Sequence, residues 1–256
     1  MKKDLLKLFI TITLILSLFA CTKDFEEMNT SPNSLTKVPY KTLITNAENS
    51  ILRTYNPILS GVVSWSRYNC RDVYVHGDRY AGLGEGTDFG YYSGHLKDLH
   101  VAMKMATEAN DDNSVAVAKI LSAYAYQNLT DWFGDIPYSE ALLSDDPENP
   151  NIFPKFDSQA SIYADIIVQL KAANAMIDET ASIGTADIIF NGNMMMWKRF
   201  CNSLLLRVYM RMSLVEPATA KTGIEEIAAD PDKYPVINSN ANAAFKYWLP
   251  NDAVYR

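Results

Sequence analysis

Apolar residues recur at helical spacing through most of this 256-residue chain, and this periodicity constrains the fold more than any other feature. The first run, over residues 42–55, is predicted to form a helix that ends at Asn56-Pro57; the short apolar stretch 58–65 that follows is ambiguous. No stretch shows a credible alternation of apolar and polar residues, so we expect an all-α fold. Stacked helical hairpins of the tetratricopeptide type are favoured, although no strict repeat of about 34 residues is present. Further helices are predicted over 96–106, 117–129, 162–177, 194–212 and 217–229.

The N-terminus carries the pattern of an export signal. Lys2 and Lys3 precede an apolar run over residues 5–19, which is too short to span about 30 Å of hydrocarbon comfortably. Ala20-Cys21 closes this run and resembles the bacterial lipobox, in which the cysteine thiol is acylated. We expect residues 1–20 to be a lipoprotein signal peptide and Cys21 to carry the lipid. An ordinary secretory signal with a chance cysteine is the alternative.

The exported part of the chain is acidic. Without residues 1–20 it has 20 basic and 29 acidic side chains, a net charge near −9, which makes nucleic acid an unsuitable partner. Residues 21–39 are rich in turn-forming residues and are predicted to be an extended tether, and residues 40–256 form the helical body. Cys70 and Cys201 are expected to be two separate buried thiols, with one disulfide as the alternative.

Motifs for catalysis, nucleotide binding and metal binding are mostly missing from the sequence. It contains no H-E-x-x-H, no G-x-S-x-G and no phosphate-binding loop. His95 and His100 would lie about 140° apart around a helix, so we expect no metal site from them. A glycosidase needs two carboxylates facing each other across a cleft, which neighbouring loop residues do not provide. We therefore expect solvated loops and helix caps from Asp111-Asp112, Asp131, Asp135 and Asp145-Asp146.

The segment from Trp65 to Tyr92 lacks periodicity and gathers aromatic and charged residues. Aromatic rings offer rigid apolar faces, and Arg and Asp supply hydrogen bonds, which suits sugar rings or peptides better than bond cleavage. Packing of these aromatics against the helices is the open alternative, and it is favoured for Tyr91 and Tyr92, which directly precede a predicted helix. The candidate ligand-binding residues are Arg67, Tyr68, Asp72, Tyr74, Arg79 and Tyr80.

One segment resembles a known family. Residues 126–141 read YQNLTDWFGDIPYSEA, a helix end followed by Gly-Asp-Ile-Pro-Tyr, which resembles the signature of the SusD/RagB family of outer-membrane nutrient-binding lipoproteins of Bacteroidetes. Three other stretches agree: CTKDFEEMN at 21–29 with Ser-Pro-Asn at 31–33, LKDL at 96–99, and WKRFCNSL at 197–204. The residues of this signature, for which we expect structural roles, are Trp132, Gly134, Asp135, Pro137, Tyr138, Trp197, Asn202 and Arg207.

The resemblance implies tetratricopeptide-like helix pairs stacked in a right-handed superhelix with long irregular loops. It also implies a lipid-anchored protein on the extracellular side of the outer membrane. Such a protein captures oligosaccharides or peptides for a TonB-dependent SusC-like transporter, without cleaving them and without a cofactor. In glycan-binding relatives part of the ligand platform precedes the Leu-Lys-Asp-Leu helix, which corresponds here to residues 65–92.

Members of that family are markedly longer, so we expect this chain to represent its N-terminal half. Two other classes remain as alternatives. One is a helical-repeat assembly protein of the envelope with no small ligand, and the less favoured one is a surface glycoside hydrolase. The sequence leaves open which nutrient is bound and which loop residues contact it. Gly134 is expected to adopt the left-handed conformation, because it ends a predicted helix and glycine tolerates that conformation best.

Overall fold

The computed structural model describes residues 38–68, 70, 79 and 90–244, and this part of the chain is all-α, as predicted. A two-residue antiparallel pair, β1 (Ile136–Pro137) and β2 (Phe156–Asp157), is the exception, with Ile136 opposite Asp157. A π-helical turn, η1 (Tyr92–Leu96), leads into the second α-helix, and a 3-10 turn, η2 (Asn240–Asn242), follows the last one. The α-helices are α3 (Tyr40–Trp65), α4 (Lys97–Glu108), α5 (Asp112–Phe133), α6 (Gln159–Met176), α7 (Met194–Met212) and α8 (Pro217–Ala229).

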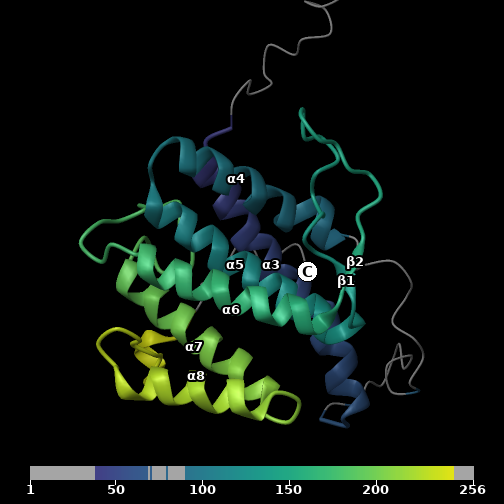
Figure 1. Cartoon of the computed structure of the whole chain (residues 1–256), viewed down its shortest axis with the longest axis vertical. Coiled ribbons are helices and arrows are strands. Elements are labelled where there is room, and N and C mark those ends of the chain that lie inside the picture. The colour runs from purple at the N-terminus through teal and green to yellow at the C-terminus, as the bar shows by residue number, and fades with distance from the viewer. Residues whose placement is uncertain (1–37, 69, 71–78, 80–89, 245–256) are drawn as a thin grey trace, which may run out of the picture. The chain divides into compact units, whose positions relative to one another are not determined.

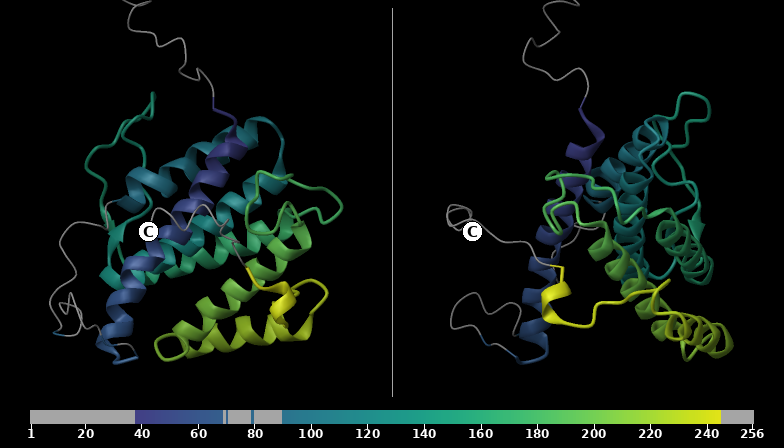
Figure 2. Two further views of the ribbon diagram at one scale, coloured as in Figure 1. Left: turned by 180° about the vertical axis from the view of Figure 1, so that it is seen from behind. Right: turned by 90° about the vertical axis from the view of Figure 1, so that its left-hand side faces the viewer.

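Each helix from α4 to α7 packs against the helix before it and the helix after it along the chain, and α8 packs against α7. Figure 1 shows this order, with α4 at the top and α8 at the bottom of the stack. Helix α3 packs against α4, η1 and α5, and it lies on the reverse face, toward the viewer in the left panel of Figure 2. None of the helices in the described ranges combines the length and apolar character needed to cross a membrane.

Local sequence signals account for the ends of these helices. The Asp111 carboxylate accepts the Ser114 N–H (3.0 Å) at the start of α5. Ser158 and Asn193 cap α6 and α7 in the same way, and Pro217 occupies the first turn of α8. Such caps satisfy backbone N–H groups that have no partner inside the helix. Helices α5 to α8 therefore lie within a few residues of their predicted positions.

Helix α3 corrects one prediction. It continues through Pro57 to Trp65, so the prediction that Asn56-Pro57 ends the helix is wrong. An interior proline removes one backbone hydrogen bond and crowds the preceding turn. The apolar residues after Pro57 continue the helical run in the sequence, and this longer run outweighs the local cost of the proline.

The cysteines correct a second prediction. Both thiols are free, and Cys201 is buried in the core while Cys70 is exposed. The expectation of a buried thiol at residue 70 is therefore wrong. Cys70 lies five residues beyond the end of α3, past the helix face that packs on the core.

The connection between α6 and α7, residues 177–193, is organised around one buried carboxylate. Asp187 accepts hydrogen bonds from the backbone N–H groups of Ile189, Phe190 and Gly192. It also accepts one from the indole N–H of Trp197, which is fully buried (Nε1 to Oδ2, 2.7 Å). Four N–H donors on one carboxylate fix this connection against α7.

Glu48 of α3 is buried beside Asp187. One of its oxygens, Oε2, accepts the Ile188 N–H at 2.8 Å, while Oε1 has no hydrogen-bond partner among the described residues. Burial, followed by the proximity of Asp187, raises the pKa of Glu48 to about 9, so this carboxyl group stays protonated at neutral pH.

Helix α8 approaches α7 closely at Gly223. A Cβ atom placed on this glycine would lie 2.2 Å from Cζ of Tyr209, so only a residue without a side chain fits there. The segment after α8 is also bound to α7. Asn202 donates to the Pro235 carbonyl (3.1 Å), and Ile237 N–H donates to the Ser203 hydroxyl (2.9 Å).

Candidate functional site

The predicted ligand platform lies only partly within the described residues. Arg67, Tyr68 and Arg79 are exposed, and the side chain of Tyr68 is 89% accessible. Arg67 has a φ of 61°, which is unusual for a residue other than glycine. The other candidates, Asp72, Tyr74 and Tyr80, lie outside the described residues, so their assignment stays a prediction.

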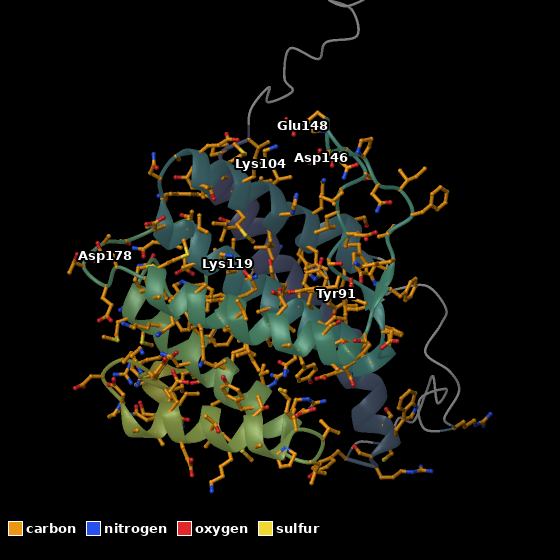
Figure 3. All side chains as sticks on the ribbon, viewed as in Figure 1. Tyr91, Lys104, Lys119, Asp146, Glu148 and Asp178 are labelled. Carbon is orange, nitrogen blue, oxygen red and sulfur yellow. The ribbon has the colours of Figure 1, made fainter. Side chains whose placement is uncertain are left out.

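Tyr91 and Tyr92, at the end of the same segment, are packing residues, as favoured above. Tyr91, labelled in Figure 3, is buried and its ring meets that of His95 edge-on, with centroids 4.6 Å apart. The hydroxyl of Tyr92 donates to the Pro137 carbonyl at 2.7 Å, and burial raises the pKa of Tyr92 to about 12. These two side chains attach the end of the segment to the helices.

The signature segment turns sharply at Gly134. Its φ of 73° is positive, as predicted, but its ψ of −115° places it outside the left-handed helical region, in a conformation open mainly to glycine. The Gly134 N–H donates to Thr130 O (2.9 Å), and the Thr130 hydroxyl donates to Gly134 O (2.6 Å). Asp135 then accepts the Gln159 N–H at 3.0 Å, which links the turn to the start of α6.

Carboxylates also hold the chain beyond this turn. Asp157 accepts hydrogen bonds from the backbone N–H (2.7 Å) and the hydroxyl of Ser139. Glu140 accepts them from the Asn151 amide and the Lys155 N–H. These bonds fold the 138–157 connection back on itself and fix Tyr138 over α6.

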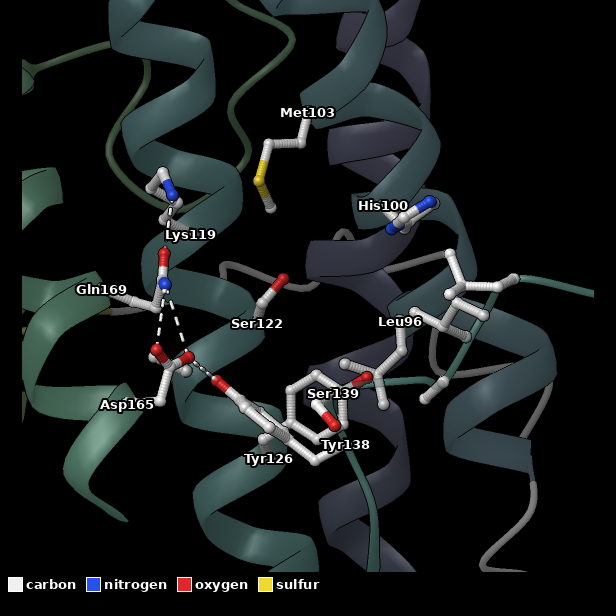
Figure 4. A pocket seen from close by; sticks show the side chains of 14 residues that line it. Leu96, His100, Met103, Lys119, Ser122, Tyr126, Tyr138, Ser139, Asp165 and Gln169 are labelled. Atoms are coloured by element: carbon white, nitrogen blue, oxygen red, sulfur yellow. Dashed lines mark hydrogen bonds between the residues drawn. The ribbon is translucent and has the colours of Figure 1, made fainter. Parts of the chain in front are cut away.

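A cavity of about 270 Å³ lies beneath this connection, between α4, α5 and α6 (Figure 4). We call it the signature pocket, because Tyr126, Tyr138, Ser139 and Ala141 of the signature segment line it. Its other lining residues are Leu96, His100, Met103, Lys119, Ser122, Ala123, Leu142, Leu143, Asp165 and Gln169.

One wall of the signature pocket is a chain of hydrogen bonds. Lys119 Nζ donates to Gln169 Oε1 (2.6 Å), and Gln169 Nε2 lies 3.3 Å from one Asp165 oxygen and 3.4 Å from the other. The Tyr138 hydroxyl donates to Asp165 Oδ2 at 2.5 Å. Burial and this contact with Asp165 raise the pKa of Tyr138, which therefore remains a hydrogen-bond donor.

The opposite wall is less engaged. Figure 4 shows His100 and Met103 of α4 across the space from the chain of bonded side chains, with Ser122 of α5 between them. Burial, more than any neighbouring charge, lowers the pKa of His100, so its imidazole is neutral at pH 7.

A second, larger groove of about 890 Å³ lies between α6 and the turn joining α7 to α8. Its polar floor is a cluster in which Asp131 accepts a hydrogen bond from the Tyr163 hydroxyl and pairs with Arg211 Nη2 (2.9 Å). Arg211 Nε also donates to the Tyr163 oxygen at 3.2 Å. The cluster joins α5, α6 and α7, which gives Asp131 a structural role.

The remaining signature residues lie elsewhere. Trp132 is 44% exposed and its ring meets that of Phe133 edge-on. Asn202 is buried and donates to Asn174 Oδ1 (3.0 Å), while Arg207 donates to Asn128 and lies over the Tyr124 ring.

Within the described part of the chain, no three His, Cys, Asp or Glu side chains form a group that could hold a metal ion. Asp111, Asp135 and Asp146 cap helices or turns, and the exposed Asp145 pairs with Lys97, in line with the expected solvated loops and caps. For Asp131 that expectation is wrong, because its side chain lies within α5, is 10% exposed and pairs with Arg211.

Comparison with known proteins adds the family. A sequence model for the SusD-like family, described as "Starch-binding associating with outer membrane", matches residues 32–255. The chain belongs to the SusD-like family. Among curated proteins no sequence matches it.

Several solved SusD-like structures share the fold. A Bacteroidetes SusD-like protein is 26% identical, with a TM-score of 0.65 over 83% of this chain and 40% of that one. A SusD homologue from Bacteroides uniformis is 28% identical (TM-score 0.53), covering 60% of this chain and 31% of that one. A chitin-binding SusD homologue from Flavobacterium johnsoniae is 29% identical (TM-score 0.50), covering 61% of this chain and 32% of that one. The chain thus spans between about a third and two fifths of the length of these relatives.

The sequence analysis missed the polar wall of the signature pocket. Asp165 and Gln169 are four residues apart on α6, a spacing that places them on one helix face and could have drawn attention to them. Lys119, on α5, is 50 residues from its partner Gln169, and no local pattern joins the two.

Proposed function

We propose that this protein is a nutrient-binding lipoprotein of the outer membrane, exposed on the extracellular side, that captures oligosaccharides without cleaving them. The observation that carries this proposal is the match to the SusD-like family over residues 32–255, a family described by starch binding and association with the outer membrane. The chitin-binding homologue supports a saccharide ligand over a peptide.

The ligand platform is assigned to residues 65–92. Tyr68 supports this assignment, because an aromatic side chain with 89% of its surface accessible is available for stacking. The positive φ of the neighbouring Arg67 is a conformation of the kind that is enriched at binding sites. Tyr74 and Tyr80 are the proposed central contacts.

Two partners complete the proposal. The lipid on Cys21 anchors the protein to the outer membrane, with residues 21–39 as the tether. A SusC-like TonB-dependent transporter receives the captured ligand. The acidic character of the exported chain suits neither nucleic acid nor an anionic ligand surface.

The binding test uses the full chain and calorimetric titration with starch oligosaccharides, chitin oligosaccharides and peptides. We expect saturable binding of an oligosaccharide with no cleavage product. Tyr74→Ala or Tyr80→Ala should weaken binding by more than about 1 kcal/mol and leave the melting temperature nearly unchanged. Tyr91→Ala, which removes a buried ring, serves as the matched control and should lower the melting temperature instead. Unchanged affinity in both loop variants would contradict the platform.

The anchor is tested by metabolic labelling with a palmitate analogue. Cys21→Ser should abolish labelling and release the protein from the membrane fraction, because the thiol is the acylation site and no other segment is proposed to hold the membrane. Cys70→Ser, which removes an exposed thiol, should label like the unmodified protein. Labelling that survives Cys21→Ser would refute the lipid anchor.

A further inference from the structure

The signature pocket has the size of a site for one small ring. Pockets that hold drug-sized molecules enclose roughly 300–1,000 Å³, and this cavity of about 270 Å³ falls just below that range. It therefore has room for a single ring rather than for a chain of several.

Hydrogen-bonding groups of both kinds face this space from two sides. On one side, Lys119 is an ammonium with three donors, of which one is used by Gln169, and Asp165 is an acceptor. The Gln169 amide contacts Asp165 only at 3.3–3.4 Å, a weak geometry that a better partner can replace. Ser122, on the same helix as Lys119, can donate and accept, and so can the neutral imidazole of His100 on the opposite wall.

The charges in the pocket cancel. Lys119 and Asp165 are linked through Gln169, and His100 carries no charge at pH 7. The charged neighbours of His100 are also balanced, with two positive groups, Lys97 and Lys104, and two negative groups, Asp145 and Asp146. A balanced set of this kind favours a neutral ligand, because an ion that either Lys119 or Asp165 attracts is repelled by the other and still loses its hydration.

Apolar groups complete the lining. Leu96, Met103 and the ring of Tyr138 offer surfaces for the C–H groups of a ring. Leu142 adds another, and its φ of 67° is strained for a leucine. Lys97 holds this conformation through a hydrogen bond to the Leu142 carbonyl (3.0 Å). Strain of this kind concentrates at ligand sites, where it fixes a side chain in place.

We propose that the signature pocket binds one neutral ring bearing several hydroxyl groups, such as a monosaccharide or a cyclic polyol. Hydroxyl groups both donate and accept, which matches the mixed groups on the two walls, and the ring carbons match the apolar lining. None of the lining residues belongs to the platform proposed at residues 65–92, and this proposal does not depend on that platform.

The test follows the methyl group of Met103 by NMR in the full chain labelled at its methionine methyl groups. Met103→Leu identifies the resonance, and Met210, an exposed methionine on α7 outside the pocket, serves as the internal control. Glucose, galactose, N-acetylglucosamine and myo-inositol are titrated separately, with glucuronate as the charged comparison. We expect at least one neutral probe to shift the Met103 methyl saturably and to leave Met210 unchanged, and glucuronate to bind more weakly.

Two matched lysine variants test the residues. Lys119→Met should weaken binding of that probe about tenfold, the value of one hydrogen bond to a charged group. Lys171→Met, whose lysine pairs with Glu226 away from the pocket, should leave it unchanged. Ser122→Ala, which removes one hydroxyl group, gives a second measure if Lys119→Met fails to fold, with a severalfold loss expected.

The proposal is overturned if no neutral probe shifts Met103, if glucuronate binds best, or if the two lysine variants behave alike. A failure of the platform variants Tyr74→Ala and Tyr80→Ala would leave this result untouched, because those variants are tested with oligosaccharides and change none of the residues that line the signature pocket.

Discussion

Two long connections flank α6, and both must satisfy the backbone N–H groups of an irregular segment. They do so in different environments. Residues 134–158 join α5 to α6, and residues 177–193 join α6 to α7. Both are held by carboxylates that accept backbone N–H groups. In the first, Asp135, Glu140 and Asp157 are exposed or half-buried, whereas in the second Asp187 is 2% exposed.

The difference shows what burial does to a polar turn. The first connection leaves its carboxylates near water and leaves space beneath it, which is the signature pocket. The second closes over Trp197, and burial, together with the nearby Asp187 carboxylate, raises the pKa of Glu48 so that it keeps a proton. A connection organised at the surface thus leaves room for a ligand, while one organised in the core serves stability.

The largest expected effect comes from removing the organising carboxylate of each connection. Asp187→Ala leaves four buried N–H donors without an acceptor and should cost about 3–5 kcal/mol in the free energy of unfolding. Asp157→Ala, where water can replace the lost acceptor, should cost about 1 kcal/mol. Urea unfolding followed by circular dichroism measures both. Equal losses would remove the distinction between the two connections.

A glycine in each connection sharpens the comparison. Gly134 and Gly192 both have positive φ, so alanine is strained at either position. A Cβ at Gly134 meets nothing within 4 Å, and Gly134→Ala should cost about 1–2 kcal/mol from the backbone alone. A Cβ at Gly192 would lie 2.3 Å from Ser182 Oγ and 2.7 Å from Gly184 N. Gly192→Ala should therefore cost about 2–4 kcal/mol. Thermal melts measure which variant loses more stability. A larger loss for Gly134→Ala than for Gly192→Ala would contradict the tighter packing expected in the 177–193 connection.

A pH dependence of stability is expected only for the second connection, through Glu48 beside Asp187. The pKa of Glu48 is raised from 4.5 to about 9 in the folded state, so the folded protein holds a proton that the unfolded chain releases between these values. The contribution of Glu48 to the free energy of unfolding is complete below the unfolded pKa of 4.5. It should fall as the pH rises toward 9, by up to about 1.4 kcal/mol per pH unit.

Glu48→Gln keeps the shape of the side chain and removes its titration. Urea unfolding across this pH window should lose the slope in Glu48→Gln, and the variant should be more stable than the unmodified protein at about pH 8. Glu225→Gln, an exposed residue of α8, should keep the slope. A slope that persists in Glu48→Gln would assign the pH dependence to other groups.

The helices could be predicted because their signals are local. Pro217 at the first turn of α8 and Gly134 at the end of α5 each act within one turn of their own position. Pro57 shows the limit of such reasoning, since a local signal to stop was overridden by the longer run of α3. Cys70 shows another, because exposure depends on which elements cover a residue.

The sites were less predictable because their partners are far apart in the chain. Glu48 lies 140 residues from Ile188, and Tyr138 lies 27 residues from Asp165. No pattern in either neighbourhood indicates these contacts. The composition of residues 65–92 indicated a region for ligand binding, but composition alone does not place individual side chains.

The close approach at Gly223 has a consequence for the end of the helical stack. Because Gly223 has no Cβ, the ring of Tyr209 can occupy that space, and this allows the short spacing between α7 and α8. A single methyl group there would act as a wedge and tilt α8 away from its neighbour. The residues after α8 would move with it, and the Pro235 carbonyl would withdraw from Asn202, leaving Asn174 as the remaining acceptor of this buried amide.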